Sequence, residues 1–361
     1  MGLRVVVMAG GTGGHIFPAL AVAKILQAQG AVITWLGAEH GMEAELVPKY
    51  GFPIVLLTVK GLRGNGLVGW LVAPFRVSRA IWQAMGAMRQ LRPQVVLGLG
   101  GFVSGPGGVA AKLLGIPLVI HEQNAVAGMT NRWLAKMATA VFYAFPQAFA
   151  KDVERPKFRF CGNPVRQEIV DTPQPEARLS ERQGDLRILV LGGSLGALVL
   201  NDIVPLALAA LKDSTPGYVV RHQTGKRTLQ ATQATYEQSQ VVAEVTAFVD
   251  DMAAAYAWAD LVICRAGALT IAELAAVGVA AILVPYPHAV DDHQTENARY
   301  LSDQNAAILV PQTEFSVKKL VSILSQLTRD KLQKMAQQSR SLAVVDAAEQ
   351  VAEYCVKVGK L

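Results

Sequence analysis

A histidine that follows a run of glycines near the start of the chain could act on an anionic ligand. The segment GGTGGH ends at His15, and the apolar run at residues 3–9 before it predicts a buried strand. Pro18 and Gly30 predict the first turn and the end of the helix that follows. A glycine loop between a strand and a helix N-terminus directs backbone N–H groups and partial positive charge into one space. The stretch predicts an anion site within reach of His15, with a tight structural turn as the alternative.

Two further loops in the first half carry glycine or polar residues directly after expected strands. GLGGFVSGPGG, residues 98–108, has the composition of a phosphate-holding turn, with a mobile surface loop as the alternative. HEQNAVAG, residues 121–128, places four polar side chains in a row; they indicate either a site or the cap of the next helix. Ligands of parallel α/β sheets bind at the carboxyl ends of strands, so both loops are candidates.

Three stretches of the second half could also carry chemistry. GGSLGA, residues 192–197, repeats the pattern of the opening stretch. In CRAGALTIAELAAVG, residues 264–278, Thr270 and Glu273 fit a capping box, which competes with a ligand role for Glu273. The polar run at residues 285–298 could hold a metal, but the chain has no Asp-x-Asp and no zinc-type spacing. We therefore expect no metal there, and a site that reads hydroxyl groups instead.

These stretches belong to alternating strands and helices, which predict an α/β protein with parallel, doubly wound sheets. Strands are expected at residues 3–9, 31–36, 53–59, 95–99, 117–121, from 186, and at 218–222, 241–248, 260–264, 280–284 and 306–310. Helices are expected at residues 77–90, 107–114, 316–325 and 347–357. A chain of 361 residues suggests two domains. A proline- and charge-rich stretch places their boundary near residues 162–166, which gives domains 1–162 and 163–344.

The distribution of charge indicates what kind of partner the protein binds, and the cysteines indicate its compartment. Residues 46–121 hold eight basic residues and no acidic one, which predicts a surface that faces an anionic partner. The three cysteines lie far apart, which is typical of reduced core residues in a cytosolic protein. We expect no secretion signal, because the chain begins directly with an expected strand, and no run reaches the roughly 18–20 apolar residues of a membrane span.

Residues 61–82 interleave apolar side chains with arginines. One interpretation is a core helix whose arginines reach out at its edge. The other is an interfacial patch on an anionic lipid surface. Such a patch would consist of Leu67, Trp70, Leu71, Phe75, Arg76 and Arg79. Nucleic acid is not expected, since no nucleic-acid module is present.

Together these segments resemble the MurG family of bacterial peptidoglycan transferases. The likeness rests on GGTGGHIFPALAVA, GLGGFVSGPGG, HEQN, GNPVR, GGSLGA, FVDDMAAAYAWAD, CRAGALTIAE and DDHQTENA, which occur in the family's order between Gly10 and Ala298. The resemblance implies a GT-B fold, with two Rossmann-like domains facing a central cleft and the last helix, residues 345–361, packing back on the first domain. It implies an inverting transfer of GlcNAc from UDP-GlcNAc to the C4 hydroxyl of MurNAc in lipid I, which gives lipid II.

The resemblance also assigns roles to residues of this chain. Donor contacts are implied for Thr12, Gly13, Gly14, Asn124, Arg166, Ser194, Val249, Arg265, Ala268, Leu269, Thr270, Glu273, His293 and Gln294. The lipid diphosphate would lie on Gly100, Gly101, Ser104 and Gly105. His15 is the expected general base, since neutral imidazole suits that work, and Glu122 is the reserve. Leu195 stands where members of the family often have glutamine, and some members have a pair of glutamines where His293 and Gln294 stand.

The expected partners and location follow from the same likeness. They are UDP-GlcNAc, lipid I and an anionic membrane surface, with no cofactor, and contacts with cell-wall synthesis proteins would be compatible. The protein would attach peripherally to the cytoplasmic face of the bacterial inner membrane. Two alternatives remain: a related GT-B enzyme with another acceptor or UDP-GlcNAc 2-epimerase activity, and a non-catalytic nucleotide-sugar sensor.

Overall fold

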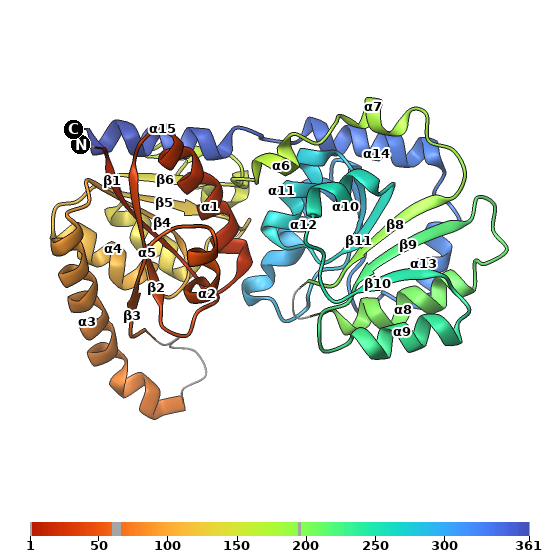
Figure 1. The fold of residues 1–361 in the computed structure, drawn as a ribbon, viewed down its shortest axis with the longest axis horizontal. Coiled ribbons are helices and arrows are strands. Elements are labelled where there is room, and N and C mark those ends of the chain that lie inside the picture. Colours follow the sequence, from red (N-terminus) through yellow and green to blue (C-terminus); the bar gives the residue numbers. More distant parts are fainter. Residues whose placement is uncertain (1, 60–65, 194–195, 361) are drawn as a thin grey trace. The chain divides into compact units, whose positions relative to one another are not determined.

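The chain forms two compact units, each built on one parallel sheet (Figure 1). The computed structural model describes residues 2–59, 66–193 and 196–360, without the side chains of residues 66–71 and Val290. Unit 1 is Met1–Arg166 with Val344–Leu361, and unit 2 is Gln167–Ala343. The chain thus enters unit 2 directly after Arg166 and returns to unit 1 for its last helix.

Unit 1 carries a seven-stranded sheet in the order β3-β2-β1-β4-β5-β6-β7. Its strands are β1 (Arg4–Ala9), β2 (Val32–Ala38), β3 (Ile54–Leu57), β4 (Val95–Gly100), β5 (Leu118–Glu122), β6 (Ala140–Tyr143) and β7 (Phe158–Phe160). Its helices are α1 (Gly13–Ala28), α2 (Met42–Lys49), α3 (Gly66–Leu91), α4 (Ser104–Leu113), α5 (Met129–Met137), η1 (Pro146–Phe149) and α15 (Ala347–Gly359).

Helices cover both faces of this sheet, which is why β1 and β4 are apolar along nearly their whole length. One core lies between the sheet and helices α1 and α15, with Ile16, Leu26 and Val351 fully buried. The other core lies under α3, α4 and α5, where Met88 and Leu134 pack. The chain therefore leaves β1 toward one face and β4 toward the other.

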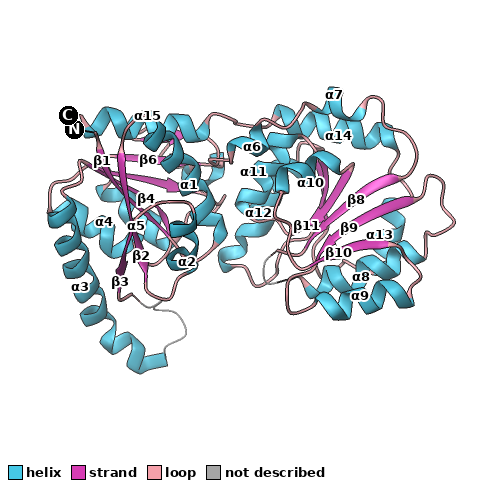
Figure 2. Cartoon of the chain, in the orientation of Figure 1, coloured by secondary structure: helices cyan, strands magenta, loops and turns pink. Residues whose placement is uncertain are grey.

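Unit 2 repeats this plan with six parallel strands in the order β10-β9-β8-β11-β12-β13. The strands are β8 (Leu186–Leu191), β9 (Tyr218–Gln223), β10 (Ala243–Thr246), β11 (Leu261–Cys264), β12 (Ala280–Leu283) and β13 (Ala307–Leu309). The helices are α6 (Gln167–Val170), α7 (Pro175–Leu179), α8 (Leu198–Ala209), α9 (Leu229–Gln238), α10 (Met252–Trp258), α11 (Ala268–Val277), η2 (Val290–Asp292), α12 (His293–Ser302), α13 (Val317–Leu324) and α14 (Arg329–Ser341). Figure 2 shows α8 and α9 on one side of this sheet, and α10 and α11 on the other.

The α/β class with doubly wound parallel sheets is confirmed, and every expected strand exists within a few residues of its predicted bounds. The expectation that Pro18 lies in the first turn of α1 is wrong. The helix starts at Gly13, inside the glycine loop, and Pro18 stands in its second turn. His15 is consequently a residue of the first helical turn rather than of the loop.

The structure also bears on the expected state of the cysteines and on the expected lack of a membrane-spanning helix. Cys161, Cys264 and Cys355 are free and buried. Among the described residues, no helix has both the length and the apolar character needed to cross a bilayer.

Candidate active site

In unit 1, the loops after β1 and β4 meet at the point where the chain turns to opposite faces of the sheet. Gly100 has a φ of +106°, and a Cβ added there would lie 2.7 Å from His15 Nδ1. A Cβ on Gly101, which has a φ of +86°, would lie 2.5 Å from the Gly10 carbonyl oxygen. Only glycine permits both the backbone conformation and this closeness. We call the loop after β1 the first glycine loop and the loop after β4 the second glycine loop. Together with His15 they form one site, at the position where α/β sheets bind ligands.

The N-terminus of α1 forms one wall of this site. Thr12 is the N-cap, and its carbonyl oxygen accepts from the N–H groups of His15 (3.1 Å) and Ile16 (3.2 Å). The exposed Thr12 and Gly14 and the half-buried Gly13 place the positive end of the helix at the surface. The guanidinium of Arg166 stacks on the ring of Phe17, a residue of α1, with 5.0 Å between the guanidinium carbon and the ring centre.

His15 is linked to the loop after β5 by a series of hydrogen bonds. Its Nδ1 lies 2.9 Å from Gln123 Oε1. The amide nitrogen of Gln123 lies 3.1 Å from His121 Nδ1, and His121 Nε2 lies 2.9 Å from the Gly162 carbonyl oxygen. Burial lowers the pKa of His121 to about 4, against the opposing effect of its bond to Gly162. His121 is therefore neutral at neutral pH.

A buried carboxylate that the sequence did not indicate supports the first glycine loop. Glu43, which is 1% exposed, accepts from the N–H groups of Gly11 and Ala38, both at 2.9 Å. Burial of a carboxylate is costly unless such donors satisfy it. Glu43 thus ties the loop after β1 to the end of β2.

The side chains of Glu122 and Ser104 are engaged in holding loops. Glu122 accepts from Asn124 N (3.0 Å), Gly128 N (3.0 Å) and Asn131 Nδ2 (2.9 Å). Ser104 is fully buried, and its hydroxyl is bonded to the carbonyl oxygens of Gly100 (2.7 Å) and Met8 (3.2 Å). Of the expected diphosphate loop, Gly101 and Gly105 are the partly exposed members. Both side chains therefore position backbone, and Glu122 is less suited than His15 to take a proton.

In unit 2, the glycine loop after β8 corresponds to the first loop of unit 1. Gly192 N donates to the Gln223 carbonyl oxygen at 2.9 Å. Ser194 and Leu195, on which two expectations fall, lie outside the described residues. A Cβ on Gly196 would lie 2.4 Å from the Thr224 carbonyl oxygen and 3.1 Å from Thr228 Oγ1. The loop therefore rests directly on the segment that follows β9.

A buried polar network supports that segment. Asn201 Nδ2 donates to the Thr224 carbonyl oxygen (3.2 Å) and to Thr228 Oγ1 (3.0 Å). Its Oδ1 lies 3.0 Å from His222 Nε2, and His222 Nδ1 lies 2.9 Å from the Tyr236 hydroxyl. Burial lowers the pKa of His222 to about 3, which keeps the ring neutral.

The capping-box interpretation of Thr270 and Glu273 is wrong. Helix α11 begins at Ala268 with Gly267 as its N-cap, so Thr270 lies inside the first turn. Glu273 is 6% exposed and accepts from the Tyr256 hydroxyl at 3.1 Å. Glu273 lies in the second turn of the helix, beyond the position of a capping-box carboxylate. Ala268 is buried, while Leu269 and Thr270 are half-buried at this helix N-terminus.

Three further expected donor residues lie on the loop after β10 (Val249), directly after β11 (Arg265) and in the first turn of α12 (Gln294). Val249 is half-buried beside the exposed Phe248. Arg265 donates to the carbonyl oxygens of Val284 (3.1 Å) and Pro285 (3.2 Å), and so joins the ends of two strands. Gln294 accepts from Tyr286 N at 3.0 Å. These contacts hold the loops in shape.

The turn before α12 is conformationally strained. Asp291 and Asp292 have φ values of +54° and +49°, and His293 is the first residue of the helix. Successive non-glycine residues in this region cost on the order of 1–2 kcal/mol each. Such strain concentrates at functional sites. Within the described part of the chain, no group of three His, Cys, Asp or Glu side chains could hold a metal ion.

Helix α3 carries the part of the expected interfacial patch whose side chains are described. Phe75 is 78% exposed and Trp82 68%, and Arg76 and Arg79 are exposed beside them. Ala73, Ala80, Ala84 and Met88 form the buried face, so the helix packs on the core of unit 1 through one side while the rings of Phe75 and Trp82 stay exposed on another. The side chains of Leu67, Trp70 and Leu71 lie outside the described part. Figure 1 shows the start of α3 extending away from the rest of unit 1.

Comparison with known proteins agrees with this geometry. Residues 5–143 match the glycosyltransferase family 28 N-terminal domain, and residues 187–351 match the C-terminal domain of that family. A Nitrosomonas europaea protein named UDP-N-acetylglucosamine--N-acetylmuramyl-(pentapeptide) pyrophosphoryl-undecaprenol N-acetylglucosamine transferase is 53% identical, over 97% of both chains. A Ralstonia nicotianae protein of the same name is 52% identical, over 98% of this chain and 96% of its own.

A solved structure extends the likeness to the fold. The crystal structure of Acinetobacter baumannii MurG superposes with a TM-score of 0.83 at 42% identity, covering 98% of this chain and 99% of that one. The two parallel-sheet domains are those of the GT-B class. The chain is a glycosyltransferase that belongs to family 28 and, within it, to the MurG transferases.

Proposed function

We propose that the chain transfers GlcNAc from UDP-GlcNAc to the C4 hydroxyl of MurNAc in lipid I, with inversion, and so forms lipid II for peptidoglycan synthesis. The names of the relatives support this activity. One observation carries the chemistry: His15 lies at the N-terminus of α1 against the second glycine loop. A base, a helix dipole and a glycine-rich backbone cradle thus occupy one site.

The reaction needs one bond formed, one broken and one proton moved. The C4 oxygen bonds to the anomeric carbon as the bond from that carbon to UDP breaks, and the hydroxyl proton passes to His15 Nε2. Negative charge grows on the departing diphosphate, where the N–H groups at the start of α11 and of the loop after β8 would stabilise it. Alignment of two bound substrates supplies roughly 7–11 kcal/mol of the barrier. No cofactor is part of this proposal.

Unit 2 would hold the donor and unit 1 the acceptor. Glu273 would accept hydrogen bonds from ribose hydroxyls, Val249 would present its backbone to uracil, and Gln294 would read the sugar. In unit 1, the backbone of Gly101 and Gly105 would hold the diphosphate of lipid I. Thr12, Asn124 and Arg166 would complete the donor contacts.

Attachment to a membrane is the part of the proposal that α3 supports. Exposed aromatic rings beside arginines suit the headgroup region of an anionic bilayer. The acid-free segment 46–121 adds long-range attraction to such a surface. We place the protein on the cytoplasmic face of the inner membrane, where an isoprenoid-linked acceptor would be accessible.

The paired substitutions Phe75→Ser and Trp82→Ser should weaken binding to anionic vesicles by a factor of about 10²–10⁴, since each ring that enters the headgroup region contributes roughly 1.5–3 kcal/mol. Co-sedimentation with vesicles of mixed anionic and neutral lipid measures this. The matched control is Leu206→Ser with Val242→Ser, which removes exposed apolar groups of unit 2. Equal vesicle binding by both pairs would argue against the patch.

Asn201→Ala should raise the KM for UDP-GlcNAc about tenfold with a smaller change in kcat, because the loop after β8 loses its support. Removal of a buried hydrogen-bonding group costs on the order of 1–3 kcal/mol. Isothermal titration with UDP checks the binding step alone. Thr235→Ala on the nearby α9 is the control, and equal affinities would contradict the supporting role.

One assay separates the proposed activity from its alternatives. Purified protein is incubated with labelled UDP-GlcNAc and a lipid I analogue. Labelled lipid product supports the transferase. Release of UDP with epimerised sugar would indicate the epimerase, and binding without turnover would indicate a sensor.

A further inference from the structure

The series of hydrogen bonds behind His15 has only one arrangement of protons that satisfies every partner. The Gly162 carbonyl oxygen can only accept, so His121 must carry its proton on Nε2. A neutral His121 then has a lone pair on Nδ1, which accepts from the amide nitrogen of Gln123. Because burial keeps His121 neutral, this assignment holds at neutral pH.

A second backbone carbonyl fixes the same orientation of the Gln123 amide. Its Nε2 also lies 3.2 Å from the His121 carbonyl oxygen. A flipped amide would set its oxygen against this carbonyl oxygen, and would require a proton on His121 Nδ1. A neutral His121 would then carry no proton on Nε2, so that Nε2 and the Gly162 carbonyl oxygen would face each other as two acceptors. Two backbone acceptors, neither of which can change protonation, therefore point Gln123 Oε1 toward His15.

The consequence falls on His15, whose Nδ1 lies 2.9 Å from that oxygen. An amide oxygen can only accept, so Nδ1 carries a proton and, in the neutral ring, Nε2 carries the lone pair. The His15 ring can lie against the second glycine loop because Gly100 has no side chain; any side chain at that position would collide with Nδ1 and Cε1. We propose that Gln123, itself oriented by His121, is a positioning residue that holds His15 as the Nδ1–H tautomer. This inference rests on the proposed role of His15 as the base that uses Nε2.

The choice of an amide rather than a carboxylate fits a site for anions. A carboxylate at position 123 would also accept from Nδ1, but it would stabilise the protonated ring and repel nearby phosphates. A neutral amide fixes the tautomer without adding charge. Gln123 is 1% exposed, so its amide is shielded from bulk solvent.

The test begins with the unmodified full-length protein labelled with ¹⁵N-histidine. Long-range ¹H–¹⁵N correlation spectra distinguish a protonated from an unprotonated ring nitrogen, and the His15 signals are those lost in His15→Gln. The expected pattern is a protonated Nδ1 and an unprotonated Nε2. A protonated Nε2 in the neutral ring would overturn the proposal without any variant.

Two variants extend the test to activity. Gln123→Leu should abolish the Nδ1–H pattern and lower kcat about 10- to 100-fold, with the KM for UDP-GlcNAc within twofold. Gln123→Glu should keep the tautomer and move the acid limb of the kcat–pH profile to higher pH. Gln83→Leu, which removes a hydrogen-bonding glutamine from α3, is the control and should change neither signal.

The outcomes separate this inference from the proposed function. If Gln123→Leu leaves the His15 pattern and kcat unchanged, the positioning role is wrong. If the pattern changes while kcat does not, Gln123 does set the tautomer and His15 is not the base.

Discussion

His15→Ala should lower kcat by a factor of about 10²–10⁴, the usual contribution of a positioned general base. The KM for UDP-GlcNAc should change little, because most of the expected donor contacts belong to unit 2. Steady-state kinetics with saturating lipid I analogue give kcat, and titration with UDP gives donor affinity separately. The split between the two parameters identifies a group that acts in the transition state.

The control for this substitution is His40→Ala. His40 is exposed on the loop after β2 and has no place in the proposed site. It should leave kcat within twofold of the unmodified protein. Turnover of His15→Ala within a few fold of normal would remove His15 as the base. Glu122, the reserve, would then have to break hydrogen bonds with Asn124, Gly128 and Asn131 to accept a proton.

The sequence was informative where local chemistry determines structure. Apolar runs of four to seven residues predicted most strands, because strands buried on both faces admit little else. The glycines at 98–108 predicted a ligand-holding turn, and the structure brings Gly101 against the backbone of Gly10 and Gly100 against the His15 ring. The polar run at residues 121–124 was visible, but Gln123 was not singled out from it.

Contacts between distant segments could not be predicted from one sequence. Nothing local indicates that Glu43 supports the loop at Gly11, because the interaction joins separate elements. The same holds for Asn201 and His222 of unit 2. The wrong positions for Pro18 and Thr270 are of one kind: α1 begins at Gly13 after the N-cap Thr12, and α11 begins at Ala268 after the N-cap Gly267. Taking Pro18 as the first turn and Thr270 as the cap placed both helix starts too late in the sequence.

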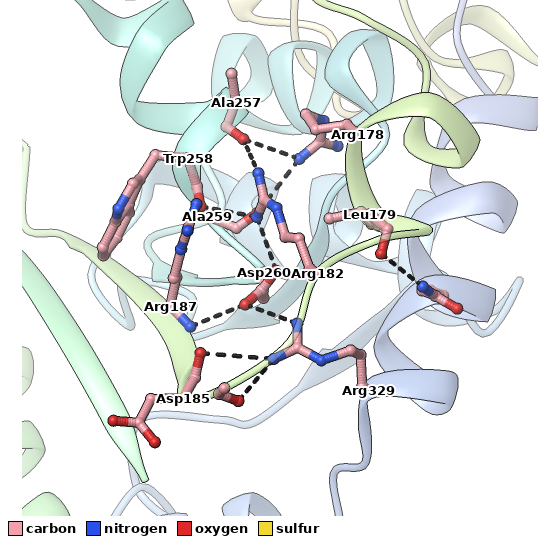
Figure 3. A network of polar contacts seen from close by, with 12 residues as sticks. Arg178, Leu179, Arg182, Asp185, Arg187, Ala257, Trp258, Ala259, Asp260 and Arg329 are labelled. Carbon is pink, nitrogen blue, oxygen red and sulfur yellow. Dashed lines mark hydrogen bonds and ion pairs between the residues drawn. The ribbon is translucent and has the colours of Figure 1, made fainter. Parts of the chain in front are cut away.

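The second large effect concerns the stability of unit 2, and it is expected on substitution of Asp260, a buried carboxylate near the starts of β8 and β11 (Figure 3). Asp260 has a side chain 3% exposed, and it contacts Arg182 at 2.7 Å and Arg329 at 3.3 Å. It also accepts from the backbone N–H of Arg187 at 2.9 Å, just after the start of β8. One carboxylate thus joins the segment before β8, the start of β11 and the start of α14.

The arginines of this network in turn satisfy the ends of two helices. Arg182 donates to the carbonyl oxygens of Trp258 (2.8 Å) and Ala259 (3.2 Å), at the end of α10. Arg178 donates to Gly278 (2.6 Å) at the end of α11, and burial lowers the pKa of Arg178 to about 10. Helix C-termini leave carbonyl groups unpaired, which side chains of this kind complete.

Asp260→Ala should therefore lower the free energy of unfolding of unit 2 by about 3–5 kcal/mol, the typical cost of removing one partner from a buried ion pair. Hydrogen exchange followed by mass spectrometry measures this in peptides that cover β11 and β12, and peptides from β1 and β4 should be unaffected. The matched control is Glu244→Ala, which breaks the exposed pair with Arg221 (side chains 61% and 38% exposed) and should cost under about 1 kcal/mol.

Asp260→Asn separates charge from shape within this network. The amide oxygen can still accept from Arg187 N or from one arginine, so part of the hydrogen bonding survives, but two guanidinium groups lose their counter-charge. We expect a loss between those of the alanine variant and the exposed control. A loss equal to that of Asp260→Ala would mean that the charge of Asp260, rather than its hydrogen bonds, stabilises unit 2. If Asp260→Ala costs no more than Glu244→Ala, the network does not anchor unit 2.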